Sequence, residues 1–338
     1  MTILAFWLGI LSCSAAQSSE HPNTHDSGSV FKIKGIALAA AVKGWDASTF
    51  PNIQKVNANS VCLMPYAFYK ESASEIIFNS PNQWWGERDE GICSSIKMAQ
   101  KAKLSIMLKP QLWLRGGEYT GNLDFKNDAD WQAFKNGYSA YILHFAKLAD
   151  SMKVESFCLG TELGNLAQKH PEYFRILIDT LRNIFHGKLT YAANWNDYEA
   201  FRAWSKLDYI GIDAYFPLDD AQQPSLEKLK RAWMFQKVKL KAISEHYKRP
   251  ILFTEYGYRN CDFACKEPWS ESSTKRNDAA QSIALQAFYE SFAHESWTAG
   301  GYLWKWYGDA EQINYQNEVD YSPQGKAAME VVRKWYGR

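Results

Sequence analysis

The chain has 338 residues, which is enough for one large domain of eight strand and helix units, since such a domain needs roughly 250 residues. Lys and Arg number 38 and Asp and Glu 37, so the chain lacks the basic field with which proteins bind nucleic acid. Its 14 Trp and 19 Tyr suit stacking on flat sugar rings, although many of these rings are expected in the core. The composition therefore favours an uncharged partner.

Residues 1–16 resemble a signal peptide, because the apolar run from Ile3 to Ile10 is too short to span a bilayer. The positively charged start of such a peptide is missing. The sequence is consistent with two alternative sites of signal-peptide cleavage. Ile10–Cys13 resembles a lipobox, after which a lipidated Cys13 would attach the protein to a membrane, whereas Ser14–Ala16 is typical of ordinary cleavage.

Residues 17–29 are too polar to be buried and are predicted to form a linker. The folded domain is therefore expected to span residues 30–338. Export follows from the leader, so the protein is predicted to be a periplasmic or cell-surface lipoprotein, or a secreted protein. We expect a monomer.

Beyond the linker, strand-like segments alternate with helix-like segments at spacings typical of βα units. The pattern predicts an α/β protein with a single (β/α)8 TIM barrel. The eight expected strands are Lys32–Leu38, Ser60–Met64, Leu104–Lys109, Ser156–Gly160, Leu189–Ala193, Tyr209–Asp213, Ile251–Glu255 and Gly301–Trp304.

Two apolar stripes at helical spacing are predicted to face the core between these strands. The lysines between Lys228 and Lys241 then occupy the solvated face of the second helix. The stripes consist of Trp131, Phe134, Tyr138, Ile142, Phe145 and Leu148, and of Leu226, Leu229, Trp233, Leu240 and Ile243.

Two glutamates lie where strands end, Glu162 after the fourth and Glu255 at the end of the seventh. Side chains at the carboxyl ends of parallel strands point into the mouth of a barrel, where such enzymes carry their chemistry. Two facing carboxyl groups can cleave a glycosidic bond. Either glutamate alone is more simply explained as a surface acid in the first turn of a helix, but the matching positions favour catalysis by both.

The cysteines indicate a disulfide rather than a metal site. Cys62 and Cys158 lie in apolar segments, where a free thiol usually acts as a small buried hydrophobe. Cys261 and Cys265 lie in one loop after Glu255 and, in an exported protein, are predicted to form a local disulfide. No zinc-type pairs of Cys or His and no His-Glu-x-x-His run are present, so no metal is expected.

Four segments in order resemble glycoside hydrolases of clan A, and most of all glycoside hydrolase family 113. They are Gly160–Leu163, Tyr209–Pro217, Phe253–Tyr258 and Gly300–Trp306, and the resemblance runs from about Phe31 to the C-terminus. It implies retaining hydrolysis of a β-linked polysaccharide or oligosaccharide, with β-1,4-mannan as the expected substrate and endo-β-1,4-mannanase as the expected activity. It implies no cofactor.

The resemblance also implies roles for the two glutamates. Glu162 takes the position of the acid/base and Glu255 that of the nucleophile, so one carboxyl stays protonated beside an ionised one. Many clan A enzymes have Asn directly before the acid/base, where this chain has Thr161. Since threonine offers one donor in place of an amide's two, the sugar contact is expected from elsewhere, and Asn194 and Asn196 are candidates unless they only shape their loop.

Further candidate substrate-binding residues follow the strands. Tyr215 is expected to donate a hydrogen bond to Glu255, and Trp304 to form a sugar platform as the resemblance implies. Lys109 either reaches a substrate hydroxyl or pairs with Asp213 in the interior. Trp113 and Trp306 are expected to extend the cleft, whereas the sequence does not place Trp45, Trp84 and Trp85.

Two other functions stay open at this point. A barrel lipoprotein can bind glycans through the same tryptophans without cutting them, although binding alone needs neither an acid nor a nucleophile. A β-glucanase on the same scaffold is the second alternative, because mannose and glucose differ in one hydroxyl orientation, read by a few loop residues.

Overall fold

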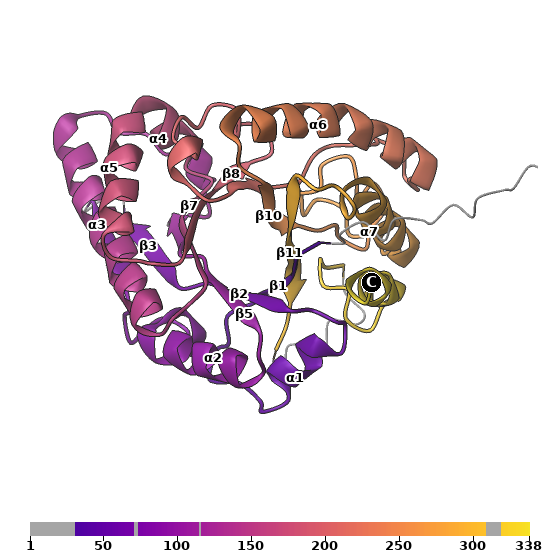
Figure 1. Cartoon of the computed structure of the whole chain (residues 1–338), viewed down its shortest axis with the longest axis horizontal. Coiled ribbons are helices and arrows are strands. Elements are labelled where there is room, and N and C mark those ends of the chain that lie inside the picture. The colour runs from indigo at the N-terminus through magenta and orange to yellow at the C-terminus, as the bar shows by residue number, and fades with distance from the viewer. Residues whose placement is uncertain (1–30, 71–73, 115, 309–318) are drawn as a thin grey trace, which may run out of the picture.

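The computed structural model describes residues 31–70, 74–114, 116–308 and 319–338 (Figure 1). The predicted signal peptide of residues 1–16, the lipobox ending at Cys13 and the linker of residues 17–29 lie outside the described residues. These three expectations, and the domain boundary at residue 30, stay predictions.

Eight parallel strands close into a barrel, surrounded by helices (Figure 1). Each strand contains most of one predicted segment, so the (β/α)8 TIM barrel is confirmed. Around the barrel the strands follow the order β1-β11-β10-β9-β8-β7-β5-β2. Their bounds are β1 (Ile33–Leu38), β2 (Ser60–Leu63), β5 (Ser105–Leu108), β7 (Ser156–Thr161), β8 (Lys188–Asn194), β9 (Ile210–Asp213), β10 (Ile251–Tyr256) and β11 (Thr298–Trp306).

The helices pack their apolar stripes on the outside of the barrel. In the longest, Asn127 caps the first turn by accepting a hydrogen bond from the amide of Asp130 at 2.9 Å, and Trp131, Phe134 and Tyr138 are buried. No helix among the described residues is long and apolar enough to cross a membrane. The bounds are α1 (Thr49–Gln54), α2 (Asp89–Lys101), α3 (Asp128–Ser151), α4 (Gly164–Lys169), α5 (Pro171–Arg182), α6 (Leu226–Tyr247), α7 (Asp278–Phe292) and α8 (Ala327–Tyr336).

A second, three-stranded sheet was not predicted. It has the order β4-β3-β6, with β3 (Tyr66–Lys70) between β4 (Glu75–Phe78) and β6 (Gln111–Leu114). β3 follows barrel strand β2 and β6 follows β5, so this sheet continues two neighbouring strands beyond the carboxyl end of the barrel. The sheet therefore lies at the carboxyl end of the barrel, where barrel enzymes have their active sites.

The core has two main layers. Side chains from nearly every barrel strand, among them Ala37, Met107, Leu252 and Tyr302, form a cluster of their own that fills the barrel. Cys62 and Cys158 belong to it and are fully buried, as predicted. A larger cluster joins the outward side chains of the strands to the helices. The filled interior leaves the carboxyl end of the barrel as the place for a site.

Candidate active site

Glu162 and Glu255 line one cavity of about 670 Å³. Glu162 directly follows β7, and Glu255 is the fifth residue of β10, so parallel strands deliver both carboxyl groups to the same end of the barrel. The side chain of Glu255 is largely buried, with 8% of the residue exposed. The two glutamates therefore share one partly enclosed space, as their positions in the sequence predicted.

Glu162 sits where the backbone leaves β7 in an unusual conformation. Its φ is +51°, in the left-handed region, which costs a residue with a side chain of order 1 kcal/mol. Its amide donates to the carbonyl of Ala192 at 2.8 Å, which holds this turn against β8. Burial, and then the charges of Asp213 and Glu255, raise the pKa of Glu162 well above its usual value. Glu162 is therefore suited to hold a proton.

The carboxylate of Glu255 accepts hydrogen bonds from three side chains. Tyr215 donates its hydroxyl to Oε2 at 2.8 Å, which is the contact expected from the sequence. Oε1 accepts from the ammonium of Lys109 and from Nε2 of Gln111, the latter at 3.2 Å. Donors of this kind stabilise a negative charge and fix the direction in which the carboxylate points.

Lys109 also binds a second carboxylate, that of Asp213, which lines the same cavity. Its ammonium lies 3.3 Å from Oδ2 of Asp213, and both side chains are buried from solvent. Thr254 donates to Oδ1 of Asp213 at 2.7 Å. Burial, and then Glu255, raise the pKa of Asp213 to about 7. Burial alone would lower the pKa of Lys109, but the charges of Asp213 and Glu255 raise it above its usual value, so the lysine stays charged.

This environment gives the two glutamates opposite properties. Burial and neighbouring negative charges favour the neutral, protonated form of Glu162. The hydrogen-bond donors around Glu255 instead favour its anion. A proton donor and a carboxylate nucleophile on either side of a sugar are the two groups that glycosidic cleavage requires. The arrangement can therefore supply both groups without a metal or an organic cofactor taking part.

The cavity also contains most of the predicted sugar contacts. Trp113, Trp304, Asn194 and Asn196 all line it. Thr161 lines it as well, and its hydroxyl is buried without a hydrogen-bond partner among the described residues. Such an unpaired buried hydroxyl is available to a ligand.

Two of the predicted substrate contacts need correction. Trp306 does not extend the cleft, because β11 falls out of regular step with β1 after Leu303, and Trp306 lies opposite Leu38 in the main core, 4% exposed. Lys109 cannot meet a substrate hydroxyl directly, since it is fully buried and absent from the cavity lining. Its predicted alternative, the pair with Asp213, is the one observed.

Several lining residues were missed. Gln111 follows Lys109 closely and could have been suspected from its position at a strand end. Tyr119 accepts a hydrogen bond from Nδ2 of Asn194 at 2.5 Å.

An aromatic pair at the cavity was also missed. Trp195 stacks on Trp269 with ring centroids 5.1 Å apart. No sequence signal brings Trp269 to the cavity, because it belongs to a long loop after β10 whose path depends on tertiary contacts. The other missed residues are Leu112, Thr120, Glu271 and Tyr321.

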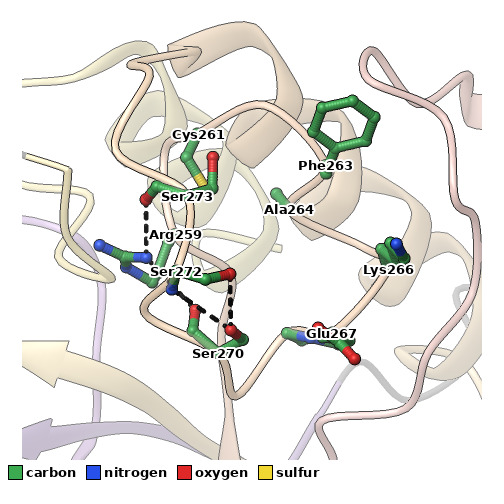
Figure 2. Close-up of a pocket in the computed structure, with 10 residues that line it drawn as sticks. Arg259, Cys261, Phe263, Ala264, Lys266, Glu267, Ser270, Ser272 and Ser273 are labelled. Atoms are coloured by element: carbon green, nitrogen blue, oxygen red, sulfur yellow. Dashed lines mark hydrogen bonds between the residues drawn. The ribbon is translucent and has the colours of Figure 1, made fainter.

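The loop carrying Trp269 is anchored by Arg259, as Figure 2 shows. The guanidinium of this buried arginine donates to the carbonyls of Ser273 at 2.9 Å and Ser270 at 3.2 Å. A separate cavity of about 140 Å³ lies within the loop. The arginine thus folds the loop back on itself and presents Trp269 and Glu271 to the larger cavity.

The predicted disulfide in this loop is not present. Cys261 and Cys265 are both free thiols in the structure. Cys261 packs with Ala264 and Ala280 in a small separate cluster, whereas Cys265 belongs to the main core. The two side chains therefore pack in different apolar clusters.

Within the described part of the chain, no group of three or more His, Cys, Asp or Glu side chains could hold a metal ion.

Comparisons with known proteins agree with this geometry. The model of Glycoside Hydrolase Family 113 matches residues 46–326. Comparison with curated proteins gives no match.

Among solved structures, the chain is similar to a family 113 β-mannanase from Alicyclobacillus acidocaldarius in complex with ManMIm, with a TM-score of 0.77, 23% identity, and coverage of 92% of this chain and 98% of that one. A complex of a family 113 β-1,4-mannanase gives a TM-score of 0.76 at 23% identity, covering 91% and 99%. A β-glucuronidase from Ruminococcus gnavus gives 0.61 at 14% identity, covering 91% of this chain and 50% of that one.

The likeness to these structures shows the shared barrel fold, and the family model covers most of the chain. The chain is a glycoside hydrolase with a carbohydrate substrate, and it belongs to Glycoside Hydrolase Family 113.

Proposed function

We propose that the chain is a retaining endo-β-1,4-mannanase that works by double displacement, with Glu162 as acid/base and Glu255 as nucleophile. One observation carries the proposal: both carboxyl groups line one cavity in environments that favour opposite charge states. The charge of Glu255 contributes, after burial and Asp213, to the raised pKa of Glu162, which further supports a close pair, as retaining enzymes require.

In the first step, Glu162 donates its proton to the glycosidic oxygen while Glu255 attacks the anomeric carbon, so that the leaving sugar departs and a glycosyl ester forms. In the second step, Glu162, now ionised, takes a proton from water. The water attacks the anomeric carbon and releases Glu255, and the product keeps the original configuration. Tyr215, Gln111 and Lys109 orient the attacking carboxylate in this scheme.

The choice of mannan rests on the family and on the names of its solved members, which are β-mannanases. Trp304 is proposed as the platform under the sugar that Glu255 attacks. The free hydroxyl of Thr161 and the amides of Asn194 and Asn196 are proposed to hold sugar hydroxyls around it. The amide of Asn194 already hydrogen-bonds Tyr119, so it would present mainly its oxygen to a sugar.

Hydrolysis of mannan, glucomannan, cellulose and xylan tests the function, with product lengths measured by chromatography and product anomers by proton NMR. We expect mannan to be cut internally, with the β-anomer as the first product. A first product in the α-configuration would refute the double displacement, and preference for cellulose would favour the β-glucanase. No hydrolysis, combined with glycan binding, would favour the binding-only alternative.

Export as a lipoprotein or secreted monomer remains part of the proposal. N-terminal analysis of the mature protein separates a lipidated Cys13 from cleavage near Ala16. Size-exclusion chromatography with light scattering tests the monomer. A mature protein that keeps Met1 would contradict export through this leader.

A further inference from the structure

Helix α6 carries an apolar stripe on the face that it turns away from the barrel. Trp233 on its inner face is fully buried, whereas Phe235, Val238 and Met234 are 75%, 71% and 63% exposed. They are the three most exposed large apolar side chains among the described residues. Residues three and four apart on a helix are neighbours, so the three form one ridge, which we name the outer α6 stripe. α6 lies at the rim of the molecule, with no labelled helix outside it (Figure 1).

The outer α6 stripe has no role in the catalytic site. No residue of α6 lines the cavity that contains Glu162 and Glu255. Single exposed apolar residues are ordinary on protein surfaces, but a contiguous exposed group marks an interaction site. The stripe is therefore best explained by a partner outside the chain.

Basic side chains flank the outer α6 stripe. Arg231 and Lys239 lie one helical turn before and after Phe235, and Lys228 lies a further turn towards the start of the helix. All three basic residues are exposed, and none of them makes an ion pair within the described part of the chain. Their charges are therefore available to an external anion.

The lysines on the side of α6 towards α7 differ from these. Lys230 lies 2.8 Å from Glu290 of α7, and Lys237 lies 2.6 Å from Glu295 just after that helix. Both charges are neutralised inside the fold. The basic residues beside the stripe are thus distinguished by their lack of a carboxylate partner among the residues that the structure describes.

The acidic residues of α6 lie towards the ends of the helix. Glu227 is in the first turn, and Glu245 is in the last, 3.8 Å from Lys241. The exposed Lys and Arg residues of the helix outnumber these two acids by two; they are Lys228, Arg231, Lys239 and Lys241. The outer face of α6 therefore combines an apolar ridge with a positive field.

This combination fits a membrane that contains anionic lipids better than it fits a second protein. A single convex ridge offers no pocket to a protein side chain, whereas a lipid headgroup layer deforms around inserted side chains. Two copies of this chain related by a two-fold axis through the stripe would bring their like-charged flanks together. Anionic headgroups instead attract Lys and Arg, which gain about fivefold in affinity for each residue near the surface.

We propose that the outer α6 stripe docks the protein on an anionic lipid surface. Phe235, Val238 and Met234 enter the boundary between headgroups and acyl chains, and Arg231 and Lys239 contact lipid phosphates. The helix lies on the surface without crossing it, since no described helix is long and apolar enough for that. The catalytic cavity, which α6 does not line, stays open to a dissolved glycan. The inference goes beyond the proposed function and is independent of the leader.

Vesicle co-sedimentation tests the inference with residues 17–338, which contain every described element and lack the apolar leader and Cys13. Vesicles of phosphatidylcholine mixed with phosphatidylglycerol are compared with vesicles of phosphatidylcholine alone. We expect much stronger binding to the mixed vesicles, weakened by added salt, since salt screens exposed charges. Phe235→Ser should weaken this binding about tenfold through lost apolar burial, and Arg231→Gln with Lys239→Gln about 30-fold through lost charge.

Matched controls carry the same kinds of change on other helices. Ile176→Ser removes an apolar side chain that is 58% exposed on α5, and Lys101→Gln with Lys147→Gln removes two exposed charges from α2 and α3. Both controls should bind the mixed vesicles as the unsubstituted chain does. Circular dichroism checks that each variant is folded, and hydrolysis of dissolved mannan should be unchanged in all of them.

Failure of the unsubstituted chain to bind mixed vesicles would overturn the inference, and so would equal binding by the α6 variants and the controls. Equally strong binding to phosphatidylcholine alone would overturn it as well. Self-association in sedimentation velocity that is lost in Phe235→Ser would overturn it in favour of an interface between two copies. The vesicle result does not depend on turnover, so failure of the proposed function and failure of this inference are separate outcomes.

Discussion

Replacing Lys109 with methionine tests the electrostatic reasoning most directly. Lys109 is the buried cation between Asp213 and Glu255, and Lys109→Met keeps the length of the side chain while removing its charge. Two buried carboxyl groups then face each other without compensation. Removing one partner from a buried ion pair typically costs about 3–5 kcal/mol of folding free energy. For a domain of this size, that corresponds to a fall in Tm of about 5–8 °C.

The loss should depend on pH in a defined direction. A carboxyl whose pKa is raised on folding holds its proton in the folded state while the unfolded chain has already released it. Stability therefore falls as pH rises from the unfolded value, about 4, through the folded value. For Asp213 this folded value is already about 7 in the wild type. Without Lys109 the window extends upward, so the difference in Tm between variant and wild type should be larger at pH 8 than at pH 5.

Loss of the Lys109 ammonium should also change the pH dependence of catalysis. Without the ammonium, ionised Glu255 is less favourable, so the acidic limb of the pH profile of kcat/KM should move to higher pH, by about one unit for each 1.4 kcal/mol of lost stabilisation. Differential scanning fluorimetry at several pH values and kinetics across the same range measure both effects. Adding Asp213→Asn to Lys109→Met should restore part of the Tm, because one of the two uncompensated charges is removed. An unchanged Tm together with an unmoved acidic limb would refute the reasoning.

Three further predictions concern single groups. Glu255→Gln should lower kcat by at least about 10⁴-fold while leaving Tm near that of the wild type, since Lys109 keeps Asp213 as a partner; near-normal turnover would contradict the nucleophile assignment. Glu162→Gln should remove the basic limb of the pH profile, because the raised pKa of Glu162 sets that limb; a basic limb that persists would exclude Glu162 as its source. Alkylation and mass spectrometry after unfolding without reductant should find Cys261 and Cys265 both modified, and a cross-linked pair would contradict the structure.

Much of the fold follows from local patterns in the chain. Strand-like apolar segments and helical stripes depend on neighbours within a few residues, which is why all eight barrel strands and the buried faces of α3 and α6 were predicted. The placement of Glu162 and Glu255 followed as well, because parallel strands present their carboxyl ends to one side. The three-stranded sheet could not be predicted, since its strands are short and its register is set by pairing between separate loops.

The sequence by itself determined the barrel, the glutamate pair and the family, because each depends on short segments in a fixed order. Only the tertiary structure decided which neighbouring residues face the cavity. It buried Trp306 and exposed Trp113, placed Lys109 under Glu255, and drew Cys261 and Cys265 into different clusters. The direction of a side chain at the end of a strand depends on pairing and packing with distant segments, and no local pattern records these contacts.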